Sequence, residues 1–354
     1  MKIGINITYG VMKNPTGVGN YILNLVQHLV NIDKSNEYIM YYRYGKVKRE
    51  YFRNYGCCNK FFEPRFSWLN IFDKIDVFHD PSFKYVKIPG AKTVITVHDV
   101  VVALDKNFSS AHFKKYNLPK LKKSIEKTDR IITVSKFSKN EIIKYFGVPE
   151  SKIDVIYSGV DTDRFKNSNN VDVSKLPEKY FLFVGNVEFR KNIINLVKAF
   201  VEFQKKHKDY YLVIIGKNGY GGEDIRKFIE SQNNKNIIEL QYVPNDKLGA
   251  YYKNSVAFVY PSYYEGFGLP VLEAMASGTV VITSNSTATV EAGGDAAVFV
   301  NPDDFHDIAE KMVTVSAMSL EEKNAVVAKG YNHIKNFNWN NTAKETLEVY
   351  NRLV

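Results

Sequence analysis

Short runs of apolar, often β-branched residues alternate along this chain with longer segments of helical periodicity. Such continuous apolar runs are typical of strands that a parallel sheet buries on both faces. Their alternation with helices predicts an α/β fold with a doubly wound sheet, covered by helices on both faces. In the first half of the chain, strands are expected at residues 2–7, 38–42, 75–79, 93–98 and 130–134.

The alternation starts again near residue 180. Because 354 residues exceed the size at which one core keeps growing, we predict two Rossmann-like domains facing across a cleft, with ligand at the carboxyl ends of the strands. A polar stretch at residues 166–175 is the expected linker. The predicted domains are residues 1–170 and 171–336, and residues 337–354 form a C-terminal helix. Strands of the second domain are expected at residues 180–184, 211–215, 237–240, 256–260, 280–283 and 297–300.

Charge is distributed unevenly along the sequence. Residues 1–170 contain 28 Lys and Arg against 16 Asp and Glu, a net +12, whereas residues 171–354 contain 20 against 22, a net −2. The densest basic patch, residues 112–127, has six lysines on a predicted helix interrupted near Pro119. It is either a solvated helix face or a contact for an anionic membrane surface or anionic substrate. Nucleic acid is disfavoured because no recognised binding module occurs.

The sequence also bears on location. No apolar run reaches the roughly 18 residues that span a bilayer, and the N-terminus lacks a signal-peptide layout. We expect a cytoplasmic protein, with peripheral contact to the inner face of the cell membrane as an open alternative. The two cysteines, Cys57 and Cys58, form no metal-ligand pattern and are expected to be reduced and structural.

Two carboxylates flank a glycine-rich turn: Glu265 precedes it and Glu273 follows it. Leu269-Pro270 predicts a helix start, since proline has a fixed φ and no N–H to lose there. Glu265 is thus expected on the loop and Glu273 on the first helical turn. Glycines let the backbone approach a ligand, and N–H groups at the helix start favour an anion, although an ordinary strand-to-helix turn fits equally well. The candidate ligand contacts are Glu265, Gly266, Phe267, Gly268, Leu269 and Glu273.

Gly17 and Gly19 follow the first predicted strand, where a loop can approach a phosphate or sugar. A nicotinamide-dependent enzyme would have a third glycine at Ile22 and an acid at the end of the second strand. Asp33 precedes that strand, so a dehydrogenase is disfavoured.

Other candidates follow predicted strands. His98 ends an apolar strand, where side chains project into the predicted cleft, although a lone histidine is more often structural than catalytic. Arg190 and Lys191 follow the first strand of the second domain and a glycine. Their positive charges can stabilise a leaving diphosphate.

Several of these motifs resemble those of the retaining glycosyltransferases of family 4, which have the GT-B fold. They are the Glu-x7-Glu segment with its Glu-Ala-Met-Ala-Ser-Gly continuation and the Gly-x4-Arg-Lys-Asn run at 185–192. The likeness covers nearly the whole chain. It implies an acceptor-binding N-terminal domain, a nucleotide-sugar-binding C-terminal domain, and a C-terminal helix that crosses back to the first domain.

The resemblance also implies roles for single residues. His98 contacts the transferred sugar, Lys191 and Arg190 bind the diphosphate, and Glu273 binds the ribose hydroxyls. Gly17 and Gly19 lie over the diphosphate and the acceptor, and backbone near Val243 reads the nucleobase. Glu265 faces the donor sugar, either as a nucleophile or as a charge that stabilises an oxocarbenium-like sugar. The predicted catalytic residues are His98, Glu265 and Lys191.

The predicted activity is that of a mannosyltransferase-like, metal-independent, retaining hexosyltransferase. GDP-mannose is the first choice of donor, and UDP-glucose, UDP-galactose and UDP-N-acetylglucosamine stay open. The acceptor is a glycan or a lipid-linked glycan, in cell-surface polysaccharide or glycolipid synthesis. A nucleotide-sugar epimerase and a non-catalytic sugar-nucleotide-binding subunit are the alternatives from other classes.

Asp161 and Asp163 match the metal-binding Asp-x-Asp of the other large transferase architecture. Their place at the exit of the first domain favours a structural role, and no His, Cys and carboxylate cluster appears in the sequence. We therefore expect no metal or other cofactor. The oligomeric state is open.

Overall fold

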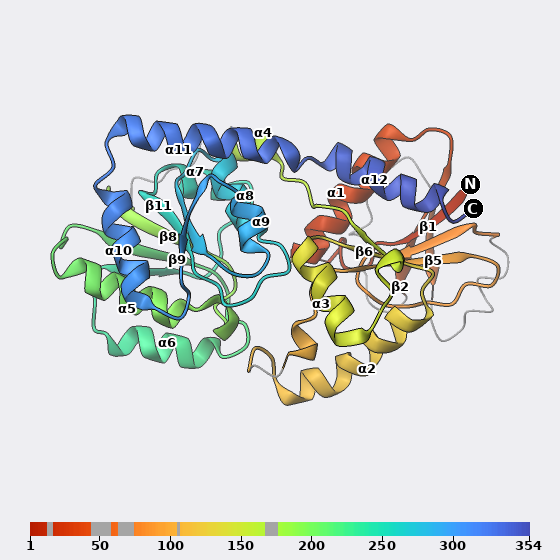
Figure 1. The fold of residues 1–354 in the computed structure, drawn as a ribbon, viewed down its shortest axis with the longest axis horizontal. Helices are drawn as coiled ribbons and strands as arrows, with labels where there is room; N and C mark the ends of the chain where they lie inside the picture. Colours follow the sequence, from red (N-terminus) through yellow and green to blue (C-terminus); the bar gives the residue numbers. More distant parts are fainter. Residues whose placement is uncertain (13–16, 44–57, 63–73, 105–106, 167–175) are drawn as a thin grey trace. The chain divides into compact units, whose positions relative to one another are not determined.

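The computed structural model describes residues 1–12, 17–43, 58–62, 74–104, 107–166 and 176–354. The chain forms two compact units, each built around its own parallel sheet (Figure 1). The first unit comprises residues 1–103, 111–159 and 337–354, and the second comprises residues 104–110 and 160–336. The main segment of the second unit begins at Val160, ahead of the predicted boundary after residue 170. Most of the predicted linker lies outside the described residues.

The first unit has a seven-stranded sheet in the order β3-β2-β1-β4-β5-β6-β7, and every neighbouring pair is parallel. Helices α1 and α12 cover one face, and α2 and α3 cover the other (Figure 1). The strands are β1 (Lys2–Asn6), β2 (Glu37–Arg43), β3 (Cys58–Phe62), β4 (Val77–Asp80), β5 (Lys92–Val97), β6 (Arg130–Thr133) and β7 (Ile153–Val155). The helices are α1 (Gly17–Ile32), α2 (Ala111–Lys127), α3 (Lys136–Phe146) and α12 (Trp339–Asn351).

The second unit has a six-stranded parallel sheet in the order β10-β9-β8-β11-β12-β13. Its strands are β8 (Tyr180–Val184), β9 (Tyr211–Ile215), β10 (Ile237–Leu240), β11 (Ala257–Tyr260), β12 (Val281–Ser284) and β13 (Ala297–Val300). Its helices are α4 (Thr162–Lys166), α5 (Ile193–Gln204), α6 (Gly222–Ser231), α7 (Leu248–Lys253), α8 (Leu269–Ala276), α9 (Thr289–Gly293), α10 (Phe305–Ser316) and α11 (Leu320–His333).

These two doubly wound sheets confirm the predicted fold class. The apolar strand runs are almost wholly buried: all five residues of β8 and all four of β11 are core residues. A strand that was not predicted, β3, pairs with β2 at the sheet edge. Its sequence, Cys-Asn-Lys-Phe-Phe, has too little β-branched character to mark a strand on its own.

The C-terminal helix packs on the first unit, as predicted. α12 lies against α1, and the Thr342 hydroxyl donates to the carbonyl oxygen of Tyr157 at 2.7 Å. The Arg352 guanidinium donates to Asp154 of the same unit at 2.6 Å. A Cβ on Gly159 would lie 2.4 Å from the backbone nitrogen of Trp339, so only glycine allows this close approach.

One predicted interruption is wrong. Helix α2 runs without a break from Ala111 to Lys127 and contains Pro119. Pro119 is exposed, so the carbonyl group that loses its helical partner there can hydrogen-bond to water.

Candidate active site

Two adjacent strand ends build the charged site of the second unit. β8 and β11 are parallel neighbours, so the turns after them lie side by side. The turn after β8 carries Arg190 and Lys191 and ends at Asn192, which has a positive φ of 59°. The Asn192 amide donates to the carbonyl oxygens of Pro261 at 2.9 Å and Pro302 at 2.6 Å. This clamp fixes Lys191 against the loop that carries Glu265.

Close packing also fixes the turn after β8. A Cβ on Gly216 would lie 1.8 Å from the carbonyl oxygen of Gly185, so the end of β9 passes the turn at a distance that only glycine permits. Gly216 therefore has a packing role in this unit.

Glu265 is the centre of a buried ion-pair cluster and is 7% exposed. Its Oε1 accepts from Lys191 Nζ at 2.6 Å and from the Tyr260 hydroxyl at 3.0 Å, and its Oε2 accepts from Arg190 Nη1 at 2.9 Å. Lys191 also contacts the Tyr260 hydroxyl. Arg190 Nη2 donates to Glu188 at 2.6 Å. Two carboxylates thus balance two cations, and the cluster is neutral as a whole.

The cluster keeps Glu265 ionised. Burial by itself raises the pKa of Glu265, but the charges of Arg190 and Lys191 outweigh it and bring this pKa to about 2. Burial and the neighbouring Arg190 lower the pKa of Lys191, and Glu265 opposes that change. Tyr260 stays a neutral donor, because burial and the charge of Glu265 raise its pKa well above the usual value.

Thr287 supports the same loop from the turn after β12. Its hydroxyl accepts from the backbone N–H of Glu265 at 3.3 Å, and its φ is 61°. Positive φ is costly for a β-branched residue, and such strain is found most often at functional sites.

Glu273 lies apart from this cluster in its contacts. It is on α8, which begins at Leu269 as predicted, so Glu273 opens the second turn and the predicted first-turn position is wrong. The Tyr252 hydroxyl donates to its Oε2 at 3.2 Å. Burial raises the pKa of Glu273, opposed by the charge of Arg164. The two glutamates are in different surroundings, one saturated by cations and one held by a tyrosine.

The glycine-rich loop between the two glutamates reaches α8 through Gly268, whose φ of 118° suits glycine. Phe267 is buried, and Gly268 would bring a Cβ to 3.2 Å from the Ala292 side chain. Gly266 and Phe267 precede the helix, and Leu269 is its first residue. The loop therefore leads directly into the positive end of a helix dipole.

Val243 is a buried residue of the loop after β10. It belongs to the second unit, with the other predicted nucleotide contacts of that domain.

His98 follows β5 in the first unit, at the carboxyl end of the sheet. Its Nε2 donates to the carbonyl oxygen of Pro81 at 2.9 Å, and the ring of Tyr21 lies edge-on at 4.8 Å between centroids. Burial lowers the pKa of His98, which favours the neutral imidazole.

A second histidine, His79, was not predicted. It is fully buried, with Nδ1 hydrogen-bonded to the Tyr350 hydroxyl of α12 at 2.6 Å and Nε2 to the Thr96 hydroxyl at 2.8 Å. Burial, followed by the charge of His98, lowers its pKa to about 3. The signal was present: Val77-Phe78-His79-Asp80 repeats the apolar-His-Asp pattern that ends at His98-Asp99.

Sequence reasoning also missed Glu188 and Tyr260, although both were inside the motifs. Glu188 is an unassigned position of the Arg-Lys-Asn motif, and Tyr260 is the last residue of a buried strand. Their roles depend on which oxygen each side chain meets.

The remaining predicted positions lie at helix starts. α1 begins at Gly17, so Gly17 and Gly19 belong to its first turn rather than to a loop. The backbone N–H of Arg164 donates to Asp161 at 3.1 Å at the start of α4. No three His, Cys, Asp or Glu side chains gather as a metal site within the described part of the chain.

Comparison with known proteins identifies the family. The family model described as Glycosyltransferase Family 4 matches residues 15–164, and that described as Glycosyl transferases group 1 matches residues 164–333. O-antigen chain mannosyltransferase B of Escherichia coli is 30% identical over 288 residues, which cover 78% of this chain and 74% of that protein. The chain belongs to glycosyltransferase family 4. It is a glycosyltransferase of the GT-B type.

Other members of the family differ in length. The serotype-specific mannosyltransferase WbdA of Escherichia coli is 29% identical over 279 residues, which cover 74% of this family 4 chain but 34% of that protein. The chain thus spans about a third of that relative. Sucrose-phosphate synthase from Thermosynechococcus elongatus has the same fold, with a TM-score of 0.78 over 99% of this chain and 98% of that one, at 17% identity.

No helix within the described ranges is long and apolar enough to cross a membrane.

Proposed function

We propose that this family 4 glycosyltransferase transfers a hexose, with retention of anomeric configuration, from a nucleoside-diphosphate sugar to a glycan or lipid-linked acceptor. The reaction would serve the synthesis of a cell-surface polysaccharide or glycolipid. The observation that carries this proposal is the contact of Glu265 with both Lys191 and Arg190 at neighbouring strand ends. In support of the proposal, a carboxylate can stabilise a positively charged sugar, and the two cations beside it can bind a diphosphate.

GDP-mannose is the proposed donor. The support comes from relatives that are named mannosyltransferases, at about 30% identity. Backbone near Val243 would read the nucleobase, and Glu273 would hold the ribose hydroxyls. UDP-linked hexoses are the competing donors.

The neutral charge of the cluster has a consequence for donor binding. Arg190 already donates to Glu188, Glu265 and the carbonyl oxygen of Tyr264, and Lys191 to Glu265. A diphosphate must therefore compete with Glu265 for these cations. As it takes them, the Glu265 carboxylate becomes available to the donor sugar.

The chemistry then needs no added proton donor. The bond between the sugar C1 and the phosphate oxygen breaks, and Arg190 and Lys191 stabilise the charge on the departing phosphate. That phosphate accepts the proton of the acceptor hydroxyl, which attacks the same face of the sugar. Glu265, which Arg190 and Lys191 keep ionised before the donor binds, then stabilises the oxocarbenium-like sugar. His98 would contact that sugar.

Glu265→Ala tests the proposal. We expect transfer from GDP-mannose, assayed with EDTA present, to fall at least about 10³-fold. Calorimetric titration with GDP and UDP should show nucleotide affinity retained or raised, because a competitor for the cations is gone. Glu310→Ala, an exposed carboxylate on α10, is the matched control.

Two results would contradict the proposal. Equal loss of transfer and nucleotide affinity would remove the separate role of Glu265. Tighter binding of UDP than of GDP to the unaltered protein would exclude GDP-mannose as the preferred donor.

A further inference from the structure

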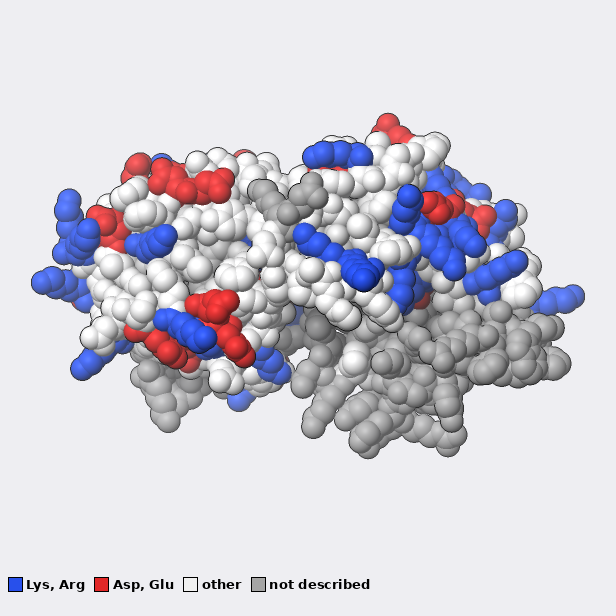
Figure 2. All heavy atoms as spheres, turned by 90° about the horizontal axis from the view of Figure 1, so that it is seen from below, with Lys and Arg blue, Asp and Glu red and all other residues white. Residues whose placement is uncertain are grey.

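The excess of basic residues in the first half of the chain includes a group of lysines exposed on one helix, α2. Lys and Arg side chains gather over the first unit, whereas over the second they are interspersed with Asp and Glu (Figure 2). On α2, Lys115, Lys120, Lys122, Lys123 and Lys127 are all exposed, and Glu126 is the only acidic residue of the helix.

Two large aromatic side chains of α2 are also exposed. Phe113 is 48% exposed and Tyr116 is 61% exposed. At 100° per residue, Phe113, Tyr116, Lys120, Lys123 and Lys127 fall within an arc of about 80°. We call these five residues the α2 stripe. Its aromatic residues come first and its lysines follow.

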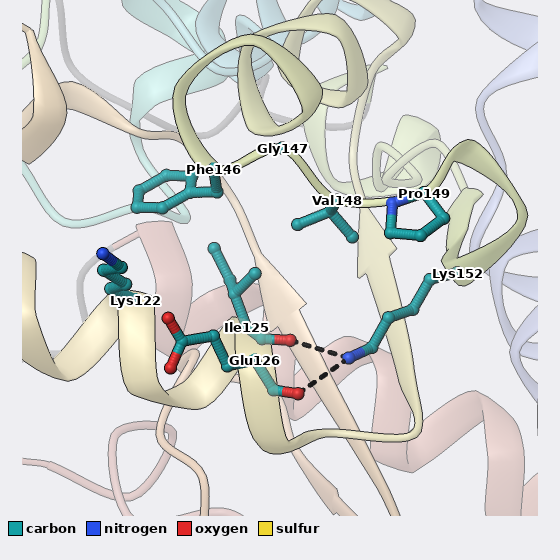
Figure 3. Close-up of a pocket in the computed structure, with 8 residues that line it drawn as sticks. All are labelled: Lys122, Ile125, Glu126, Phe146, Gly147, Val148, Pro149 and Lys152. Atoms are coloured by element: carbon teal, nitrogen blue, oxygen red, sulfur yellow. Dashed lines mark hydrogen bonds between the residues drawn. The ribbon is translucent and has the colours of Figure 1, made fainter.

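The opposite, buried face of α2 holds the helix rigidly on the first unit. Leu121, Ser124 and Ile125 pack into the unit. Lys152 Nζ donates to the carbonyl oxygens of Ile125 at 2.9 Å and Glu126 at 3.1 Å, which satisfies carbonyl groups at the end of the helix (Figure 3). The stripe is therefore held in a fixed orientation on the first unit.

A cavity beside the helix adds apolar surface. It has a volume of about 220 Å³ and lies between α2 and the turn after α3 (Figure 3). Its apolar walls come from Ile125, Phe146, Val148 and Pro149, and Lys122 lines it as well. The volume is below the roughly 300 Å³ at which ligand pockets start, so this is not a second nucleotide-sugar site.

We propose that the α2 stripe docks the first unit on an anionic lipid surface, with Phe113 and Tyr116 in the interfacial layer and the lysines on lipid phosphates. Lysines beside exposed aromatics match this surface, because aromatics favour the membrane interface and cations favour anionic headgroups. Nucleic acid would account for the lysines but would leave Phe113 without an apolar environment. The docking is independent of the donor proposed above.

Vesicle binding tests the charges. We expect the chain to bind vesicles of phosphatidylcholine mixed with phosphatidylglycerol, to bind pure phosphatidylcholine far less, and to lose affinity as salt rises. Reversal of Lys120, Lys123 and Lys127 to Glu should weaken binding at least about 100-fold, since each lysine contributes about fivefold. The control reverses Lys206, Lys208 and Lys227, exposed lysines of the second unit, and should change binding less than about threefold.

Phe113→Trp tests insertion. Its added fluorescence should shift to the blue and be quenched by brominated lipid when anionic vesicles are added, whereas that of Leu320→Trp, at a position 76% exposed on α11, should not. Equal loss of binding in both lysine variants would overturn the proposal. So would an unshifted signal from the Phe113→Trp variant, or binding to a DNA duplex as tight as to anionic vesicles.

Discussion

Both units bury titratable side chains near the carboxyl end of a parallel sheet, but the first unit keeps them neutral and the second keeps them charged. In the first unit His79 is buried as a neutral ring between two hydroxyls, and burial likewise favours neutral His98. In the second, Glu265, Lys191 and Arg190 keep their charges by pairing. Burial excludes the charged form unless an opposite charge is close, so the partner decides which form survives.

This difference should appear first in a substitution that breaks the charge balance of the second unit. Lys191→Met leaves Glu265 buried with one cation fewer and should lower the free energy of unfolding by about 3 kcal/mol or more. Urea denaturation followed by far-ultraviolet circular dichroism measures the loss. Lys198→Met, an exposed lysine on α5, is the control and should change stability by less than about 0.5 kcal/mol. A loss as small as the control's would mean that the ion pairs contribute little.

Falling pH should destabilise the first unit before it destabilises the second. The pKa of His79 is lowered from about 6.5 in the unfolded chain to about 3 in the folded one. Its contribution is complete above the unfolded value and is lost as pH falls below it, because the unfolded chain takes up the proton first. The first unit should lose roughly 2 kcal/mol between pH 6.5 and 4.5. Glu265, with its lowered pKa, stabilises the second unit until pH falls below its unfolded value of about 4.3.

Tryptophan fluorescence distinguishes the units, because the sequence of the second unit has no tryptophan. The urea midpoint that fluorescence reports should therefore fall as pH decreases. The part of the circular-dichroism transition that does not coincide with the fluorescence change comes from the second unit, and its midpoint should fall only at lower pH. In the His79→Asn variant, the stability of the first unit should depend less on pH. A fluorescence midpoint that stays constant from pH 6.5 to 5 would contradict a buried neutral histidine.

The smallest expected effect tests the hydrogen bond from α12. Tyr350→Phe leaves Nδ1 of His79 without its hydroxyl partner and should lower the stability of the first unit by about 1 to 2 kcal/mol. Tyr242→Phe, at a position 54% exposed, should have almost no effect. If both variants behave alike in fluorescence-monitored denaturation, α12 is held by its apolar contacts and not by this bond.

Strands were predictable because a parallel sheet leaves a direct mark on the sequence. β8, β9, β10 and β13 begin and end where their apolar runs predicted them. The site residues Glu265, Arg190 and Lys191 could be chosen for a similar reason: each follows such a strand in a recognisable motif. Strand β3 could not be predicted from the sequence, because a strand at the edge of a sheet needs little apolar character.

The sequence by itself determined the alternation of strands and helices, the start of α8 at Leu269, and the family. Only the tertiary structure decided how the charges are used. It paired Glu265 with Lys191 and Tyr260, and it brought Tyr350 to His79 across 271 positions of sequence. Local patterns fix secondary structure because the period of burial is written in neighbouring residues. Partners of buried polar groups come from distant segments, and packing alone decides which of them meet.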